Sequence, residues 1–400
     1  MSPRIIELPE YETKSFAEDE LKEDLIMALH AAYPNQISVE PPSFLNSYCW
    51  RLTSQGWVGY IPLTSEVHFS LVPKVPIRNL FGMLEYAYRL KGFRVVEGLV
   101  DSGSITELYD RLALILAKRI LDRMRKGLYR SYIPESDNLP YVRGRIDVQA
   151  YIRSAMPAML PCHFEEHTGD LEDNQILLWT LSRILSCGIC SDRSLPYVRQ
   201  AGRSLQGFVT AAPFCAEQCF DRLYNRLNQD YEPMHALCRF FLEHTGPTHW
   251  MGDRRMLPIL VDMERLFELF VVEWLKEHRP EGYEVHEQVN VQLMMGRTIS
   301  INIDITIEDL NKRCTLLVLD TKYKASEEPA PTDIQQIVAY AAAKNCRRAV
   351  LVYPILLRQP IRGPWGHNIQ VETLAFRLDG NIEECGKELL TQLIPPQNPE

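Results

Sequence analysis

Apolar and polar residues alternate most regularly in the C-terminal third of the chain. Between residues 298 and 307 an isoleucine occupies every second position. Because successive side chains of a strand point to opposite faces, this period of two predicts a strand with one apolar face. Asp304 falls among the polar positions. The pattern therefore predicts a strand that carries one carboxylate on the face opposite its isoleucines.

A second apolar segment follows at residues 313–320 and leads into the tripeptide Asp320-Thr-Lys322. The polar residues between the two segments predict a turn, and hence an antiparallel hairpin. If the pairing centres on residue 312, Asp304 lies opposite Asp320, and a shift of two residues would leave them diagonal but still neighbours. Directly opposed residues are roughly 4.5–5.5 Å apart. Two carboxylates at that separation repel each other. A divalent cation between them would remove the conflict.

Segments with helical spacing flank the hairpin on both sides. Residues 261–277 form an apolar stripe with Glu268 on another face, and residues 333–344 place Gln336 and Tyr340 four apart on one face. Two alternatives are open for Glu268: a further carboxylate of a metal site, or an exposed surface acid. Gln336 would hydrogen-bond a substrate phosphate or a water on the metal, or it is part of a polar helix edge.

The combination of Asp304, Asp320 and Lys322 is coherent as a site for phosphodiester hydrolysis. Carboxylate oxygens, together with waters and phosphate, are the ligands that suit Mg²⁺. Mg²⁺ held by Asp304 and Asp320 would polarise a phosphate and lower the pKa of a water. Lys322 would orient the attacking water or stabilise developing charge. Asp-x-Lys alone is a common tripeptide, so the inference depends on the hairpin and the flanking helices together.

The rest of the chain divides into two further regions. Short alternating runs between residues 45 and 75, interrupted by Gly, Ser and Pro, predict a β-rich N-terminal module. Helical periodicity at 105–126 and over much of 160–250 predicts a helical middle region. We therefore expect a multidomain α+β chain, with a β-rich domain at 1–104, a mainly helical region at 105–250 and an α/β domain with the order α-β-β-β-α-β at 251–400.

Composition narrows the class of protein. The 400 residues carry a net charge of −9, which argues against a protein that coats nucleic acid nonspecifically. Neither a signal peptide nor an apolar run of roughly 18 residues is present, so we expect no membrane partner. Ten scattered cysteines are typical of reduced thiols in a cytoplasmic protein. Two alternatives stay open for the close pairs Cys187/Cys190 and Cys215/Cys219: a metal site or plain thiols.

One stretch of the middle region is rich in cations. It would supply the local basic surface that DNA binding requires, or it is a solvated helix face followed by a loop. Its members are Lys118, Arg119, Arg123, Arg125, Lys126, Arg130, Arg143, Arg145 and Arg153.

The catalytic candidates resemble the PD-(D/E)xK nuclease superfamily, and the chain as a whole resembles the McrC family of modification-dependent restriction systems. One departure is Ile303, which stands where the superfamily has a proline. The C-terminal motifs are Leu266-Phe-Glu268, Ile303-Asp304-Ile305, Asp320-Thr-Lys322-Tyr323-Lys324 and Asp333-x-x-Gln336-x-x-x-Tyr340; the others are Gly56-Trp-Val-Gly59, Pro73-Lys74, Gly127-Leu-Tyr129, Tyr141-Val-Arg-Gly-Arg-Ile-Asp147 and Glu165-Glu-His-Thr-Gly-Asp170 with Asn174.

The resemblance implies the endonuclease subunit of a type IV, methylcytosine-dependent restriction complex. Asp304, Asp320 and Lys322 would be catalytic with Mg²⁺, and Glu268 and Gln336 auxiliary. It also implies a McrB-like AAA+ GTPase hexamer that reads methylated DNA and whose GTP hydrolysis the N-terminal part stimulates. The sequence contains no phosphate loop of its own, which fits a separate motor. Two alternatives remain: a stand-alone Mg²⁺-dependent DNA endonuclease, or a motor activator with a vestigial nuclease site.

Overall fold

The chain folds into two compact units, each with helices and strands, so the expected mixed α+β class is confirmed. The first unit joins Met1–Leu108 to Gly246–Glu400, and the second is Tyr109–Thr245. None of the helices in the described ranges is long and apolar enough to cross a membrane. The computed structural model describes residues 4–64, 66–90, 105–153, 158–220, 222–245, 249–251, 254–256, 258–292, 300–324, 328–365 and 368–394.

A β-rich module begins the first unit, as the alternating sequence predicts. Its four-stranded sheet has the order β1-β6-β5-β12, and a three-stranded sheet has the order β2-β4-β3. Alternate residues of these strands are buried in one apolar core that includes Leu8, Leu52 and Phe69. The elements are β1 (Arg4–Pro9), β2 (Thr13–Phe16), α1 (Glu23–Ala32), β3 (Ile37–Glu40), β4 (Trp50–Ser54), β5 (Trp57–Pro62), β6 (Val67–Val72) and α2 (Ile77–Ala87).

The last strand of the four-stranded sheet comes from far along the chain. Strand β12 (Ile259–Asp262) pairs antiparallel with β5 and leads directly into helix α8 (Met263–His278). The first unit thus joins the segments 1–104 and 251–400, which the sequence assigns to separate domains. The boundaries expected near residues 105 and 250 lie close to the limits of the second unit.

Gly59 allows the close approach of β5 and β12. Its φ is +153°, and a Cβ there would lie 2.0 Å from the carbonyl oxygen of Ile259. We expect Gly59→Ala to push the strands apart and to lower the free energy of unfolding by about 3 kcal/mol. Thermal unfolding of the variant measures this. Gly207→Ala is the control, because a Cβ at Gly207 meets no atom within 4 Å; equal stability of the two variants would contradict the prediction.

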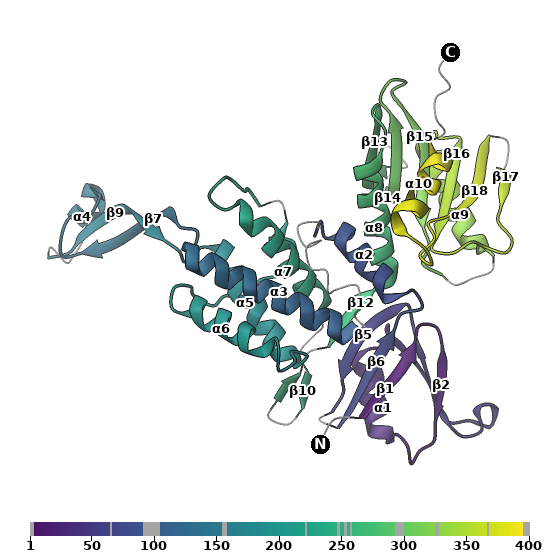
Figure 1. The fold of residues 1–400 in the computed structure, drawn as a ribbon. Helices are drawn as coiled ribbons and strands as arrows, with labels where there is room; N and C mark the ends of the chain where they lie inside the picture. The colour runs from purple at the N-terminus through teal and green to yellow at the C-terminus, as the bar shows by residue number, and fades with distance from the viewer. Residues whose placement is uncertain are drawn as a thin grey trace. The chain divides into compact units, whose positions relative to one another are not determined.

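The C-terminal part of the first unit is built on a six-stranded sheet of order β13-β14-β15-β16-β18-β17 (Figure 1). Helix α9 packs against β15, β16 and β18, and α8 contacts β13 and β15. The small hairpin of β10 (His249–Met251) and β11 (Arg254–Met256) precedes this part in the chain. The elements of this part are α8, β13 (Tyr283–Gln292), β14 (Ser300–Asp309), β15 (Cys314–Thr321), α9 (Pro331–Ala343), β16 (Arg348–Tyr353), β17 (Arg362–Trp365), β18 (Ile369–Ala375) and α10 (Ile382–Leu393).

Three details differ from the sequence prediction. The first helix begins at Met263 and not at 261, because Asp262 caps it by accepting hydrogen bonds from the amides of Glu264 and Arg265 at 3.0 and 3.2 Å. Strand β14 runs to Asp309, into the expected turn. The sequence prediction also missed β17, β18 and α10. Ile299, the first isoleucine of the alternating run, is outside the described residues.

The second unit consists of helices and a hairpin. In Figure 1 the hairpin of β7 and β9, with α4, extends from the end of the helical part of this unit. The expectation of a mainly helical region therefore missed these strands, whose side chains are mostly exposed. The elements are α3 (Ile105–Lys126), β7 (Ser131–Leu139), β8 (Arg145–Ile146), α4 (Val148–Arg153), β9 (Leu160–Thr168), α5 (Glu172–Cys187), α6 (Leu195–Gln206) and α7 (Glu232–His244).

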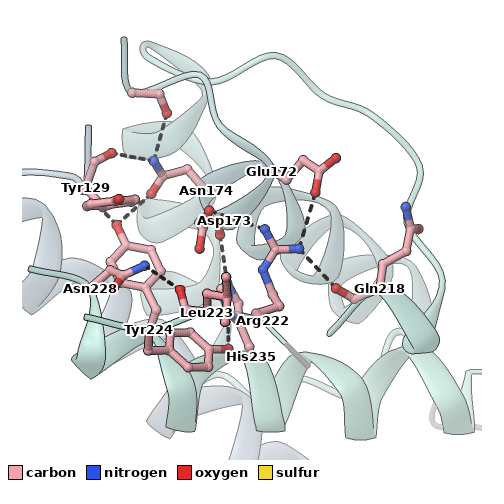
Figure 2. A network of polar contacts seen from close by, with 12 residues as sticks. Tyr129, Glu172, Asp173, Asn174, Gln218, Arg222, Leu223, Tyr224, Asn228 and His235 are labelled. Atoms are coloured by element: carbon pink, nitrogen blue, oxygen red, sulfur yellow. Dashed lines mark hydrogen bonds and ion pairs between the residues drawn. The ribbon is translucent and has the colours of Figure 1, made fainter. Parts of the chain in front are cut away.

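A buried polar network fixes the base of this hairpin (Figure 2). Asn174, fully buried on α5, donates to the carbonyl oxygens of Tyr129 and Gly169 at 2.9 and 2.7 Å and accepts from Tyr231 at 2.6 Å. His235 binds the Asp173 carbonyl at 2.9 Å, and burial lowers the pKa of this histidine to about 4, so its ring stays neutral. Tyr129 and Asn174, which belong to the resemblance motifs, therefore have structural roles.

Candidate active site

The hairpin register brings the two candidate metal ligands together. Ile305 pairs with Leu319 and Ile307 with Leu317, which is a pairing centred on residue 312. Extended by one step, this register places Asp304 opposite Asp320. Toward the turn, a bulge after Ile307 shifts the pairing by one residue. The irregularity is therefore at the turn end, and the end with the acids keeps the register that the sequence predicts.

The two acids interact strongly. Asp320 is completely buried and Asp304 is partly buried. Burial is the largest of the causes that raise the pKa of Asp304 to about 8; hydrogen bonding and repulsion from Asp320, then repulsion from Glu268, raise it further, and only Lys322 lowers it. Without a cation, Asp304 therefore holds a proton near neutral pH. The repulsion between carboxylates expected from the sequence is present in the folded chain.

Lys322 lies against the same pair. Its Nζ is 2.9 Å from Oδ2 of Asp320 and donates to Oε1 of Gln336 at 3.1 Å. Burial lowers the pKa of Lys322, but the neighbouring carboxylates of Asp320, Asp333 and Asp304 outweigh burial and leave it raised. Lys322 is therefore a protonated ammonium group that contacts Asp320 on β15 and the side-chain amide of Gln336 on α9.

Glu268 approaches the acids from α8. Burial raises the pKa of Glu268, and repulsion from Asp320 adds to this, whereas a hydrogen bond from Gln288 lowers it. The Gln288 amide donates to Oε1 of Glu268 at 2.5 Å. Gln288 is a residue that the sequence prediction missed: it lies opposite Asp304 in the β13–β14 register and has a left-handed φ of +47°. A glutamine at such a φ is unusual, and nothing local in the sequence predicts it.

Helix α9 completes the cluster. Nε2 of Gln336 donates to the hydroxyl of Tyr340 at 2.7 Å, so Lys322, Gln336 and Tyr340 form a chain of hydrogen bonds. Near the start of the helix, Lys324 donates to both carboxylate oxygens of the buried Asp333 at 3.1 and 3.2 Å. The structure thus gathers the candidates Asp304, Asp320, Lys322, Glu268 and Gln336 in one place. Their catalytic roles stay predictions.

The donor atoms of the cluster are of the kind that Mg²⁺ binds. Oδ1 of Asp320 is buried and accepts no hydrogen bond from the described residues, and a buried acceptor without a partner is costly. With Asp304 deprotonated, the carboxylates of Asp304, Asp320 and Glu268 face the one ammonium group of Lys322, and a divalent cation would balance their charge. Within the described ranges no group of three or more His, Cys, Asp or Glu side chains is arranged to hold a metal. Mg²⁺ fits nevertheless, because it commonly takes one or two carboxylates and completes its shell with water and phosphate.

We expect Asp304→Asn to stabilise the metal-free protein. The raised pKa of Asp304 means that its charged form is disfavoured in the folded chain, so its contribution to stability is present at low pH and is lost as pH rises toward 8. A neutral amide avoids this loss. Unfolding at pH 8.5 without divalent ions should show a gain of about 1 kcal/mol. The gain in the free energy of unfolding should vanish at pH 4, where the carboxyl group of Asp304 and the amide of the variant are both neutral in the folded chain. A variant less stable than the parent at both pH values would contradict the argument.

Two other candidate features lie outside this cluster. Among the basic residues of the middle region, Arg123 pairs with Asp230 at 3.2 Å, Arg125 with Asp122 at 2.8 Å and Arg143 with Glu166 at 3.7 Å, so part of the positive charge is already compensated. DNA contact by this stretch stays a prediction. All ten cysteines are free thiols, including Cys187/Cys190 and Cys215/Cys219.

Comparison with known proteins points to one family. The family model described as "McrBC 5-methylcytosine restriction system component" matches residues 52–354. A curated relative from Escherichia coli (strain K12), the "Type IV methyl-directed restriction enzyme EcoKMcrBC", is 24% identical over 268 residues, which are 64% of this chain and 75% of the relative.

A solved structure shares the fold over almost the whole chain. It is described as "Refined half-complex from tetradecameric assembly of Thermococcus gammatolerans McrB AAA+ hexamers with bound McrC". The matching chain superposes with a TM-score of 0.58 at 15% identity, covering 98% of this chain and 100% of that one. At this identity the likeness concerns the fold.

Proposed function

The chain belongs to the McrBC 5-methylcytosine restriction system component family, and from this premise we propose that it is the Mg²⁺-dependent endonuclease subunit of such a system. The resemblance to the McrC family is confirmed. The proposal goes further in three respects: a PD-(D/E)xK nuclease domain in the C-terminal part, cleavage of DNA, and work with an AAA+ GTPase.

One observation carries the nuclease proposal. The completely buried carboxylate of Asp320 has an oxygen that accepts no hydrogen bond from the described residues, and it lies opposite Asp304 and contacts Lys322. A merely structural cluster would be more stable with apolar residues, because buried charges in excess of their partners cost free energy. A site that gathers a cation and a phosphate would need this excess of negative charge and the single ammonium group beside it.

The residues of the chain divide the work as follows. Asp304 and Asp320 hold Mg²⁺, which when bound supplies positive charge that polarises a phosphate. Lys322 stays protonated, so it donates hydrogen bonds to the scissile phosphate and offsets charge in the transition state rather than acting as a base. Gln336 fixes the direction of Lys322, and Gln288 fixes that of Glu268. Glu268 adds negative charge to the metal shell.

The partner is part of the proposal. The related solved structure contains McrC bound to McrB AAA+ hexamers. We infer the same class of partner here, since the sequence lacks a phosphate loop and the fold matches over 98% of the chain. In this assignment the partner reads 5-methylcytosine and hydrolyses GTP, and the C-terminal part of this chain cuts the DNA.

The test combines the purified chain with its cognate AAA+ GTPase, Mg²⁺ and plasmid that is either methylated at cytosine or unmodified. We expect double-strand breaks only with the methylated plasmid, both proteins and GTP, and none with a GTP analogue that is not hydrolysed. Robust cutting by the chain and Mg²⁺ alone would favour a stand-alone nuclease. Stimulated GTP hydrolysis without breaks under any divalent metal would favour a motor activator with an inactive site.

A further inference from the structure

The residue directly after the catalytic lysine is held by the N-terminal module. The hydroxyl of Tyr323 donates to Oε2 of Glu10 at 3.1 Å. The hydroxyl of Tyr11 donates to the backbone oxygen of Tyr323 at 3.2 Å. Two consecutive residues directly after β1 therefore hold both the side chain and the main chain of Tyr323. We call this arrangement of Glu10, Tyr11 and Tyr323 the Tyr323 clamp.

The N-terminal module fixes the clamp residues in turn. The Glu10 amide donates to the Val72 carbonyl at 3.0 Å, and the Lys74 amide donates to Oε2 of Glu10 at 2.9 Å. The Tyr11 amide donates to the Ser54 carbonyl at 3.0 Å. Glu10 is fully buried, and its Oε1 has no hydrogen-bond partner in the part of the chain that the structure describes. A buried acid of this kind costs stability, so apolar packing does not explain it.

Tyr11 adopts a backbone conformation that needs support. Its φ is +57°, in the left-handed region that a bulky residue rarely adopts. A Cβ at Gly56 would lie 2.5 Å from the Tyr11 hydroxyl, so Gly56 leaves room for this ring. Gly56 and Lys74 belong to the motifs Gly56-Trp-Val-Gly59 and Pro73-Lys74, to which the nuclease reaction gives no role. In the clamp, Gly56 leaves room for the Tyr11 ring, and the Lys74 amide donates to Glu10.

Tyr323 also contacts helix α8, which carries Glu268. Its ring lies 5.9 Å from the ring of Phe267, the residue before Glu268. A cavity of about 240 Å³ borders the clamp, with Glu10, Tyr11, Lys74 and Tyr323 among its lining. Protein atoms therefore do not pack around the clamp on all sides. The two clamp hydrogen bonds, together with the bond from the Lys322 amide to the Val352 carbonyl at 2.9 Å, fix where the chain leaves β15.

We propose that Glu10 and Tyr11 are positioning residues of the nuclease site. By holding Tyr323 they fix the end of β15, and with it the place of the Lys322 ammonium group between Asp320 and Gln336. This inference rests on the proposed nuclease function. Loss of the clamp lets the end of the strand shift, and a displacement of about 1 Å can cost a reaction up to roughly 100-fold.

The test uses the full chain with its AAA+ partner, methylated DNA and Mg²⁺. Tyr323→Phe and Tyr11→Phe each remove one clamp hydroxyl and keep the ring. We expect kcat for cleavage to fall about tenfold in each, with KM for DNA within about twofold. Mg²⁺ binding to the chain alone, measured by calorimetry, should weaken about threefold, because the charges around the cation are less well placed. Both variants should keep the thermal stability of the parent within a few degrees.

Two further variants separate positioning from general loosening. Glu10→Gln keeps an oxygen that accepts from Tyr323 and Lys74, so it should retain cleavage that Glu10→Ala loses. Tyr60→Phe is the matched control: it removes a hydroxyl of the same module whose hydrogen-bond partner is His68 and not a clamp residue. Tyr60→Phe should cleave within about twofold of the parent.

Specific outcomes would overturn the inference. Parental kcat and Mg²⁺ affinity in both Tyr323→Phe and Tyr11→Phe would show that the clamp does not position the site. An equal fall in Tyr60→Phe would show that any loosening of the module has the same effect. Undiminished cleavage by Lys322→Ala would instead overturn the nuclease assignment on which the clamp depends, so the two failures are distinguishable.

Discussion

Replacement of Lys322 by alanine is expected to lower kcat for DNA cleavage by about 10³-fold or more. Among the described residues the ammonium group is the only cation in contact with the buried Asp320, at 2.9 Å, and it also donates to Oε1 of Gln336. Its removal takes away the hydrogen-bond donor for the phosphate and leaves Asp320 without a positive neighbour. Cleavage in the reconstituted complex, at saturating methylated DNA and GTP, measures the effect.

The control is a second lysine of the same hairpin. Lys312 lies at the turn, pairs with Asp309 at 3.3 Å and has a side chain that is 70% exposed. Lys312→Ala should cleave like the parent. GTPase stimulation should be unchanged in both variants if the partner binds elsewhere on the chain. Cleavage by Lys322→Ala at the parental rate, with the protein folded and the partner active, would remove the proposed active site.

The hairpin shows how far local sequence patterns reach. The period of two in β14 and the turn after it were enough to predict that Asp304 and Asp320 are neighbours on one face, because strand geometry fixes which face each residue occupies. That they lie directly opposite each other was predicted only for a pairing centred on residue 312. The spacing of four in α9 likewise put Gln336 and Tyr340 on one face. These contacts lie within or beside one supersecondary unit, where sequence distance and spatial distance agree.

The same patterns fail where the chain pairs with itself over long distances. Nothing near residue 260 indicates that β12 completes the sheet of β5, because the closeness of Gly59 to Ile259 depends on both strands at once. The clamp has the same origin: Glu10 and Tyr323 are 313 positions apart. Gln288 was missed for a different reason, since its left-handed φ contradicts the local preference of a strand residue. Such local conflicts commonly mark functional sites.

Mg²⁺ binding to the chain is expected to weaken steeply as pH falls from 8 to 6. Asp304 has a pKa of about 8 in the metal-free protein, chiefly through burial and then through Asp320, so below pH 8 it carries a proton that must leave before the carboxylate can bind a cation. One such proton lowers the apparent affinity about tenfold per pH unit well below the pKa, or about 50-fold from pH 8 to pH 6. Calorimetry of the chain with MgCl₂ at several pH values measures the affinity.

The proton itself can be counted. Titrations at pH 7 in buffers of different ionisation enthalpy should show about one proton released for each Mg²⁺ bound. Asp304→Asn is the control: it should bind Mg²⁺ more weakly at pH 8 and lose most of the pH dependence, because the titrating group is gone. Glu268→Gln should keep the dependence on Asp304 and shift it to lower pH, since repulsion from Glu268 contributes to the raised pKa of Asp304. Equal Mg²⁺ affinity at pH 6 and pH 8 would mean that Asp304 is not a ligand, and the metal site would then have to be sought around Asp320 and Glu268 without it.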